Sequence, residues 1–455
     1  MFKGQVSLTE GSVAKGMLVF AIPIFFSNLF QQLYNAVDSL IVGNFLGGNA
    51  LAAVGSSGSL IFLLTGFVNG VSLGAGVLIA RHYGAKDSEA LKRTVHTTVA
   101  LGLAVSVVLT VLGVVLTPQI LRWMGTPDDV FVNSVVYFRV YFLGSTAVVL
   151  YNIGASILQS VGDSRSPMYY LIAASLLNVV LDLLFVGVFH FGVGAAALAT
   201  IISQAASAFL AFRKLTLSPE DYGVRWKQVR FHPATLRAVV AQGVPSGVQN
   251  SVISLANVIV QANINSFGAQ AMAGCGAYSK IEGFAFLPVT CFSMALATFV
   301  SQNIGAAKLD RVRKGMRFGL VTSPLLAEGI GLAIFALAPL LIAAFNGEPD
   351  VIAFGVRQAR TVSLFYCLLA FSHCCAGILR GLGRPTVPMI VMLAVWCALR
   401  ITYITVVLRL IPDIGVIFWA YPLTWSISSI LFAWYLAHCP LPSPGGGAPT
   451  RGNLH

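Results

Sequence analysis

Residues 157–162 read Ile-Leu-Gln-Ser-Val-Gly, and residues 378–383 read Ile-Leu-Arg-Gly-Leu-Gly. An offset of 221 residues superposes these two stretches. The same offset aligns Gly84 with Gly305, Pro118 with Pro339, Asp129 with Asp350 and Gly194 with Gly415, and an offset of 222 aligns Pro23 with Pro245. Chance matches would not keep one register across so many separate segments, so the chain contains two copies of one structural repeat.

The composition places these two copies in a membrane. Of the 455 residues, 57% are hydrophobic and only 10% are charged, and the mean hydropathy is +0.83. A soluble protein of this size needs far more charge to cover its surface, which excludes a soluble enzyme. A helix crosses the hydrocarbon core with roughly 20 apolar residues, and it satisfies its own backbone polar groups there. We therefore expect an all-α polytopic membrane protein.

Apolar runs between charged or Gly-, Pro- and Asn-rich breaks predict twelve transmembrane helices. They cover residues 14–42, 54–80, 94–116, 131–157, 167–189, 192–212, 238–265, 274–301, 316–343, 352–378, 387–409 and 414–437. The repeat contains six spans, an even number, so both copies enter from the same side as parallel repeats. We expect two pseudo-symmetric six-helix lobes at 1–218 and 238–440. A cytoplasmic linker at 219–237 joins them, and a cytoplasmic tail at 441–455 is expected to be disordered.

The basic residues predict the orientation of the chain. With the N-terminus inside, 21 of the 28 Lys and Arg residues fall on the inner side, four on the outer side and three within spans. This asymmetry predicts an even number of spans with both termini in the cytoplasm. We expect a multi-pass protein of the plasma (inner) membrane of a prokaryote. The net charge of +12 therefore reflects topology, and no nucleic-acid partner is expected. The first apolar stretch lacks a small-residue cleavage site, so we expect a retained span.

Two acids lie inside predicted spans of the first lobe, where a charge costs roughly 2.5 to 3.5 kcal/mol. Asp38 follows Asn35 by one turn in span 1. Asp182 follows Asn178 by one turn in span 5, and Thr200 in span 6 adds a hydroxyl. Such oxygens suit Na⁺, and two buried carboxylates also form a site that takes up a proton. The set predicts a cation site, and the alternative is that both acids merely anchor neighbouring helices through hydrogen bonds.

The second lobe carries different charges. The counterparts of Asp38, Asn178, Asp182 and Thr200 are Val260, Leu399, Tyr403 and Tyr421. Lys280 and Glu282 lie in span 8, and Arg400 lies in span 11. Because Lys280 and Glu282 are two residues apart and cannot face each other, Glu282 should meet a basic group on another span, with Arg400 a candidate. A buried ion pair that fixes the lobe and a polar or substrate site, with Asn35 as a further member, both remain open.

Pro23 and Pro245 occupy matching places in spans 1 and 7, where each should kink its helix. Pro23 lies about four turns before Asp38, so ion binding could change this bend, although a static kink is the alternative. We expect no catalytic residue, no cofactor and no metal other than Na⁺. The chain has no Walker, HExxH or nucleophile motif, and its cysteines show no metal-ligand spacing.

Several short motifs occur together along the chain. They are Asp38 after a proline-bearing first span, Gln-Ser-Val-Gly-Asp-Ser-Arg-Ser-Pro (159–167), Asn178 with Asp182, and Val-Ser-Gln-Asn-Ile-Gly-Ala (300–306). This combination resembles the multidrug and toxic compound extrusion (MATE) family over essentially the whole chain. The resemblance implies a V-shaped pair of lobes and antiport of organic, often cationic compounds against H⁺ or Na⁺.

The resemblance also implies roles for particular residues. It assigns Asp38, Asn178, Asp182 and Thr200 to the first-lobe cation site of the family, and Pro23 to the bend that span 1 shows in some members. One branch of the family uses further acids in spans 7 and 10. Here neither span contains Asp or Glu, so we do not expect that second site.

These observations lead to three hypotheses. The first is a monomeric, secondary active multidrug exporter that antiports small organic molecules against H⁺ or Na⁺ by alternating access of two lobes, in contact with membrane lipid. The second is a flippase of the same superfamily for a lipid-linked or polyprenyl precursor, which requires a basic cavity. Arg139, Lys280 and Arg400 offer some basic character for it. The third, a membrane enzyme or channel, has no supporting motif.

Overall fold

The computed structural model describes residues 6–123 and 126–440, except for the side chains of residues 48–49, 51–52 and 55–64. Within these ranges the regular structure is helical and no strand occurs, which confirms the all-α fold class. The elements of the first half are α1 (Val13–Leu46), α2 (Gly48–Ala85), α3 (Ser88–Trp123), α4 (Asp128–Leu143), α5 (Ser145–Ser160), α6 (Arg165–Asp182), the π-helix η1 (Leu183–Val188) and α7 (Val193–Leu217). The predicted tail at 441–455 lies outside the described residues.

The second half continues with a short 3-10 turn and then a further series of helices. Its elements are η2 (Trp226–Gln228), α8 (Pro233–Asn265), α9 (Ala269–Gly305), α10 (Leu309–Ala343), α11 (Pro349–Val362), the 3-10 turn η3 (Ser363–Phe365), α12 (Tyr366–Gly381), α13 (Thr386–Met392), the π-helix η4 (Leu393–Leu399), α14 (Arg400–Leu410) and α15 (Gly415–His438). Each of the twelve predicted spans therefore coincides with one helix or with a run of consecutive helical elements.

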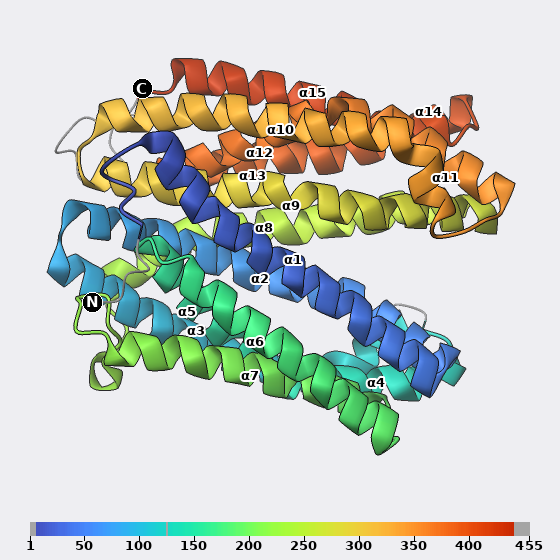
Figure 1. Cartoon of the computed structure of the whole chain (residues 1–455), viewed down its shortest axis with the longest axis horizontal. Coiled ribbons are helices and arrows are strands. Elements are labelled where there is room, and N and C mark those ends of the chain that lie inside the picture. Colours follow the sequence, from blue (N-terminus) through green and yellow to red (C-terminus); the bar gives the residue numbers. More distant parts are fainter. Residues whose placement is uncertain (1–5, 124–125, 441–455) are drawn as a thin grey trace. The chain divides into compact units, whose positions relative to one another are not determined.

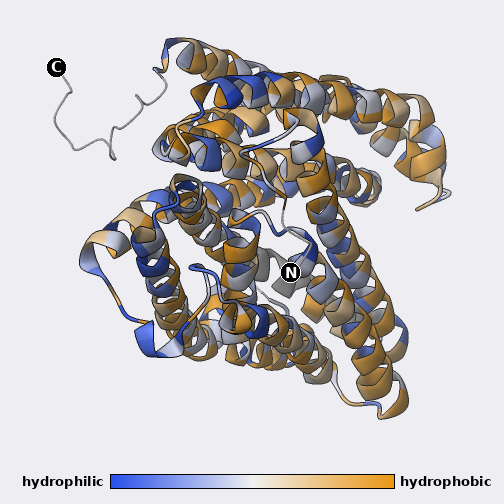
Figure 2. Ribbon diagram, turned by 60° about the vertical axis from the view of Figure 1, so that its left-hand side comes forward, coloured by the Kyte–Doolittle hydropathy of each residue, from blue (hydrophilic) through white to orange (hydrophobic). Residues whose placement is uncertain are grey.

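Length and composition of the helices agree with a multi-pass membrane protein. Among the described residues, nine helices are long and apolar enough to cross a membrane, and ten if α4 and α5, bent by 47°, form one span. The 38 residues of α2 and the 33 of α8 occupy the two other predicted spans. Figure 2 shows hydrophobic residues along the helices, while many hydrophilic residues lie at helix ends and in connecting turns.

Backbone conformation confirms the internal repeat. Three pairs of residues with positive φ are related by the offset of 221: Gly47 (85°) with Gly268 (99°), Lys86 (56°) with Ala307 (57°), and Gly162 (91°) with Gly383 (83°). Positive φ is uncommon, so its recurrence at matched turns shows that the two halves are built alike. A helix break recurs as well, because Gly144 between α4 and α5 corresponds to Phe365 at the end of η3.

Contacts divide the chain into two compact units. Unit 1 consists of Met1–Val6, Phe20–Gly76 and Glu89–Val258, and unit 2 consists of Ser7–Val19, Val77–Ser88 and Ile259–His455. Within unit 1, α7 packs against α4, α5 and α6, and within unit 2, α9 packs against α10, α11 and α12 (Figure 1). The boundaries of the units do not follow the repeat, because unit 2 includes the start of α1 and the end of α2, whereas unit 1 includes most of α8. The division into lobes at 1–218 and 238–440 stays a prediction.

Glycines allow two helices of unit 1 to approach closely. Gly66, Gly70 and Gly74 form a stripe of small residues along α2. A Cβ atom on Gly70 would overlap the backbone of Gly247 in α8, and a Cβ atom on Gly74 would overlap the backbone of Gly243. The contact between α2 and α8 therefore tolerates no side chain at Gly70 or Gly74.

The segment between the two halves is folded onto unit 1. Arg225 donates hydrogen bonds to the carbonyls of Thr216 (2.6 Å) and Ser218 (2.8 Å) at the end of α7. Its backbone N–H donates to Nε2 of His96 in α3 (2.9 Å), and the neighbouring Val224 is fully buried. The segment is thus an ordered part of unit 1, and α8 begins at residue 233, inside the predicted linker.

Candidate ion-coupling site

Three helices of unit 1 each contribute two polar residues to one cluster. The pairs are Tyr34 with Asp38 on α1, Asn178 with Asp182 on α6, and Thr200 with Gln204 on α7. The members of each pair are four residues apart, so they share one face of their helix. Asp182 is the last residue of α6, and the π-helical segment η1 begins directly after it. Wide turns of this kind are frequent at functional sites of helices.

The structure brings the four predicted site residues together. The carboxyl groups of Asp38 and Asp182 lie within hydrogen-bonding range of each other, and their residues are only 8% and 0% exposed. Asn178, 1% exposed, donates its side-chain N–H to the hydroxyl of Thr200 at 3.5 Å. The Thr200 hydroxyl donates in turn to the carbonyl of Ala196 at 3.2 Å.

Buried oxygen atoms of this cluster have no hydrogen-bond donor among the described residues. They are Oδ1 of Asp38, Oδ1 of Asn178, both carboxyl oxygens of Asp182, and Oε1 of Gln204. An unpaired buried acceptor costs about 1 to 3 kcal/mol, and a charged one costs more. A proton shared by the two carboxyls, or a cation bound among the oxygens, supplies the missing positive partner. This set of oxygen ligands therefore fits H⁺ or Na⁺.

Tyrosine and glutamine side chains that the sequence did not single out complete the cluster. Tyr34 hydrogen-bonds with the side chains of Gln31 and Gln204 and interacts electrostatically with Asp38. Tyr137 of α4, only 6% exposed, also interacts with Asp38. Tyr34 lies one turn before Asp38 and could have been found by helical spacing. Tyr137 carries no such signal, because only the packing of α4 brings it near the acids.

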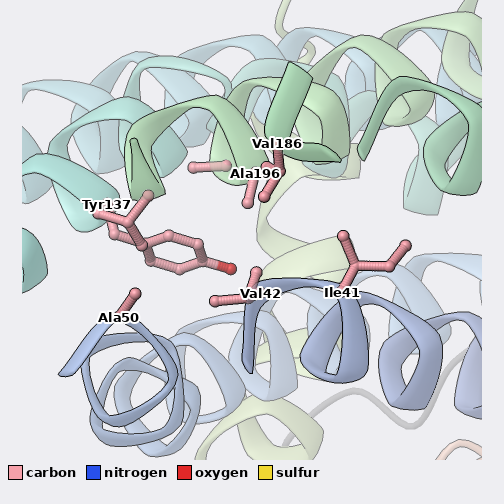
Figure 3. Close-up of a cluster of buried hydrophobic side chains, with 8 residues drawn as sticks. Ile41, Val42, Ala50, Tyr137, Val186 and Ala196 are labelled. Carbon is pink, nitrogen blue, oxygen red and sulfur yellow. The ribbon is translucent and has the colours of Figure 1, made fainter. Parts of the chain in front are cut away.

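An apolar layer borders the polar cluster. Its buried residues are Ile41, Val42, Ala50, Tyr137, Val186, Val193, Ala196 and Ala197. Figure 3 shows the Tyr137 hydroxyl pointing between Val42 and Ala196. Val42 follows Asp38 by four residues, Val186 follows Asp182 by four, and Ala196 precedes Thr200 by four. The layer therefore lies one turn from the polar cluster on all three helices, and it keeps water from that side.

Pro23 and Asn35 have different places on α1. Pro23 is buried, and α1 remains one continuous α-helix through it, so the predicted bend stays a prediction. Asn35 has an exposed side chain, whereas Asp38 one turn later is buried. From this part of α1 the cluster takes Tyr34 and Asp38.

In unit 2 the structure brings Glu282 and Arg400 into electrostatic interaction and leaves Lys280 exposed. Arg400 is 2% exposed and donates from Nε (3.3 Å) and Nη2 (2.8 Å) to the hydroxyl of Thr424. Its guanidinium carbon lies 4.5 Å from the centre of the Tyr421 ring. A hydroxyl and an aromatic face therefore hold this buried cation.

Comparison with known proteins agrees with the repeat. The sequence profile of the MatE family matches residues 23–184 and again residues 245–405. The two matches begin at Pro23 and Pro245, and their ends are 221 residues apart. The family profile therefore recognises the same two copies that the sequence offset and the backbone reveal.

Individual relatives cover nearly the whole chain. Probable multidrug resistance protein YoeA of Bacillus subtilis is 30% identical over 398 residues, which cover 85% of this chain and 86% of that protein. Probable multidrug resistance protein NorM of Thermotoga maritima is 27% identical, over 88% of this chain and 87% of that protein. An outward-facing multidrug resistance MATE family transporter of the MOP superfamily shares the fold, with a TM-score of 0.89 at 21% identity over 96% of this chain and 98% of that one. The chain therefore belongs to the multidrug and toxic compound extrusion (MATE) family, whose members are membrane transporters and not enzymes.

Proposed function

We propose that this protein is a secondary active exporter that moves organic, often cationic compounds out of the cell in exchange for H⁺ or Na⁺. The observation that carries the proposal is the group of buried acceptor oxygens centred on Asp38 and Asp182, for which the described part of the chain supplies no hydrogen-bond donor. Two relatives that cover most of the chain are named multidrug resistance proteins, which supports organic compounds as the cargo.

The chemistry of the cluster explains how an ion could drive the cycle. With neither proton nor cation bound, Asp38 and Asp182 would place two like charges side by side in a buried site, which is strongly unfavourable. Binding of one ion removes this repulsion, and Asn178 and Thr200 would complete the oxygen shell of Na⁺. The site thus has two states of very different charge, and alternating access would expose it to each side of the membrane in turn. Pro23 would allow α1 to bend between these states.

The available gradients are sufficient for steep export. One pH unit supplies about 1.4 kcal/mol per proton. A potential of 100 mV supplies about 2.3 kcal/mol per elementary charge. One or two ions per cycle therefore cover a large concentration ratio of cargo. We place the protein in the plasma membrane of a prokaryote as a monomer, with both termini in the cytoplasm, because the basic residues are concentrated on one predicted side.

A flippase for a lipid-linked precursor is the alternative function. Its anionic cargo requires a basic cavity, whereas the oxygens of the Asp38 and Asp182 cluster that lack a partner among the described residues are acceptors suited to positive charge. The basic Arg400 of unit 2 is already engaged by Thr424 and Tyr421. The names of the relatives also favour multidrug export. Loss of cell-wall precursor export on deletion of the gene would support the alternative.

A drug-efflux assay in a host without its own pumps tests the exporter. We expect Asp38→Asn and Asp182→Asn each to abolish resistance and efflux of a fluorescent organic cation. Asp129→Asn is the matched control, because Asp129 is an exposed acid of α4 in the same half and should leave efflux unchanged. Full efflux by both cluster variants would overturn the assignment. Proteoliposomes with pH and Na⁺ gradients imposed separately then identify the coupling ion.

A further inference from the structure

The carboxyl group of Glu282 in unit 2 is hydrogen-bonded to a series of two buried tyrosine hydroxyls. The hydroxyl of Tyr278, one turn before Glu282 on α9, hydrogen-bonds to Oε1 of Glu282 at 3.1 Å. The same hydroxyl lies 2.8 Å from the hydroxyl of Tyr366, the first residue of α12. Tyr278 and Tyr366 are 0% and 1% exposed. Three side chains thus connect the middle of α9 to the start of α12 through direct hydrogen bonds.

The charge of Glu282 determines which group donates the proton in each of these two hydrogen bonds. Each tyrosine hydroxyl has one proton to donate. When Glu282 is ionised, Tyr278 donates to the carboxylate, and Tyr366 donates to Tyr278. When Glu282 binds a proton, it can donate to Tyr278, and Tyr278 then donates to Tyr366. In this second state the hydroxyl of Tyr366 needs a new acceptor, so one proton on Glu282 reverses both hydrogen bonds.

The surroundings of Glu282 leave its charge free to change. Arg400 of α14 and Tyr421 of α15 interact with it electrostatically, but the hydrogen bonds of Arg400 go to Thr424. On its own helix, Lys280 is exposed.

The charged groups on the helices that pack against α9 include Glu328 of α10 and Arg360 of α11, and both of these have other partners. Glu328 of α10 accepts the backbone N–H of Cys367 at 3.0 Å, and the guanidinium of Arg360 of α11 lies over the ring of Phe335. No described side chain forms a direct ion pair with Glu282 within 4.0 Å. Arg400 therefore compensates part of the charge of Glu282 without fixing it.

The far end of the hydrogen-bond chain lies at a break in a span. Tyr366 directly follows the 3-10 turn η3, which separates α11 from α12. Its ring packs against Phe286 and Trp425, with centroids 5.8 Å and 6.2 Å away. The buried hydroxyl of Ser363 in η3 has no hydrogen-bond partner among the described residues. A change in the hydrogen bonding of Tyr366 therefore acts where the helix is already interrupted and where one buried side-chain hydroxyl lacks a partner among the described residues.

We propose that Glu282 is a second proton-binding group of the transport cycle, and that Tyr278 and Tyr366 relay its charge state to the break between α11 and α12. The inference rests on the proposed ion-driven export, but it uses a different carboxyl in the other unit. Binding of a proton to Glu282 adds one positive charge to unit 2 and reverses the donors and acceptors of both hydrogen bonds. Release of the proton restores the original charge and the original hydrogen bonds. Glu282 thereby makes the conformation of unit 2 depend on pH.

Infrared difference spectroscopy of the purified protein in lipid nanodiscs tests proton binding directly. We expect a pH titration to show the carbonyl band of a protonated carboxyl that Glu282→Gln removes. Tyr278→Phe should move the midpoint of this band by about 1 pH unit, because it removes a hydrogen bond to a charged group. Glu348→Gln, which changes an exposed acid, and Tyr169→Phe, which removes an exposed hydroxyl, are the matched controls and should leave the band unchanged.

The same measurement separates this inference from the proposed function. Asp38→Asn and Asp182→Asn should leave the Glu282 band in place. Wild-type transport by those two variants would overturn the role of the acid cluster while the Glu282 band still stood. Absence of any band sensitive to Glu282→Gln between acid and neutral pH would overturn the second proton site. A midpoint unaffected by Tyr278→Phe and Tyr366→Phe would overturn the relay.

A transport readout completes the test. In proteoliposomes, Glu282→Gln should retain exchange of cargo driven by a cargo gradient and lose part of its dependence on pH, because one titrating group is gone. An unchanged pH profile in this variant would also overturn the inference. Complete loss of cargo binding, without a titrating band, would identify Glu282 as part of a cargo site instead and would contradict the proposal.

Discussion

The acid cluster of unit 1 and the Arg400 cluster of unit 2 occupy related places in the two copies of the repeat. Asp182 directly precedes the π-helix η1, and Arg400 directly follows the π-helix η4. Thr200 of the first cluster corresponds to Tyr421 of the second. Corresponding spans of the two copies, spans 5 and 11, thus each place a charged residue next to a π-helix. The charges, however, are of opposite sign.

The two clusters differ in how well their charges are satisfied. Arg400 donates to Thr424 and lies over the ring of Tyr421, so protein groups alone hold its charge. The oxygens of Asp182 have no donor among the described residues. Buried polar groups normally find partners, so a group left without one marks a place where something else binds. We therefore expect ion binding in unit 1 and a structural role for Arg400 in unit 2.

The largest expected effect comes from removing either of the paired acids. We expect Asp38→Asn and Asp182→Asn each to lower the ion-driven export rate on the order of 100-fold to 1,000-fold. The double variant should be no slower than the single ones, because both carboxyls act on the same ion. Initial uptake rates in inverted membrane vesicles, with an imposed pH or Na⁺ gradient, measure this. Losses that multiply in the double variant would show that the two acids act independently.

Arg400→Met should affect stability more than transport. The substitution removes a hydrogen-bonded cation from the ring of Tyr421, and we expect the free energy of unfolding to fall by about 2 to 3 kcal/mol. Export should continue, with a changed pH dependence through Glu282. Thermal unfolding in detergent, measured beside the efflux rate, checks both parts. A variant that is as stable as the wild type but no longer exports would contradict the structural role of Arg400, because Arg400 would then act on an ion or on the cargo.

The fold could be predicted from the sequence because its signals are long and repeated. Apolar runs predicted twelve spans, each of which coincides with a helix or a run of helical elements among the described residues, and the offset of 221 located the two copies. The interruptions could not be predicted. The bend at Gly144, the turn η3 and the π-helices η1 and η4 depend on which carbonyl each backbone N–H reaches, and no residue pattern encodes that choice.

The candidate site was predicted only in part, for a related reason. Asp38 and Asp182 stand out in the sequence because a charge is costly in an apolar span. Tyr137, Tyr278 and Tyr366 do not stand out, because a tyrosine in a span usually packs in the core. Their roles depend on the rotation of each helix and on contacts across helices, which the sequence of one helix does not fix.

A threonine-to-valine substitution in each unit separates the structural role proposed for unit 2 from the ion binding proposed for unit 1. Thr424→Val leaves the donors of Arg400 without their acceptor, and we expect a loss of about 1 to 2 kcal/mol in unfolding free energy with little change in export. Thr200→Val removes one oxygen from the ion site, and we expect export to fall several-fold with little change in stability. Unfolding temperatures and efflux rates of both variants test the contrast. Equal effects of the two substitutions on both quantities would contradict it.

The smallest expected effect concerns an exposed ion pair of unit 2 that unit 1 lacks. Nη2 of Arg357 lies 2.7 Å and 3.0 Å from the two carboxyl oxygens of Asp413 in the turn before α15. The corresponding residues of the first copy, Val136 and Gly192, carry no charge. Because both partners are about half exposed, with side-chain exposures of 50% and 45%, we expect Arg357→Gln to cost about 0.2 to 1 kcal/mol, and less at high salt.

The pH dependence of this small effect follows from the sign of one pKa shift. The Arg357 guanidinium and the backbone N–H of Gly415 hydrogen-bond to Asp413 and lower its pKa. A carboxyl with a lowered pKa in the folded state stabilises the fold above its unfolded pKa of about 3.9 and loses this contribution as the pH falls through the folded value. The difference in unfolding temperature between wild type and Arg357→Gln should therefore be present at neutral pH, begin to fall below about pH 4, and vanish once the pH is below the lowered pKa of Asp413. A difference independent of pH and salt would mean that Arg357 acts by packing, and that its charge contributes as little to unit 2 as the uncharged pair does to unit 1.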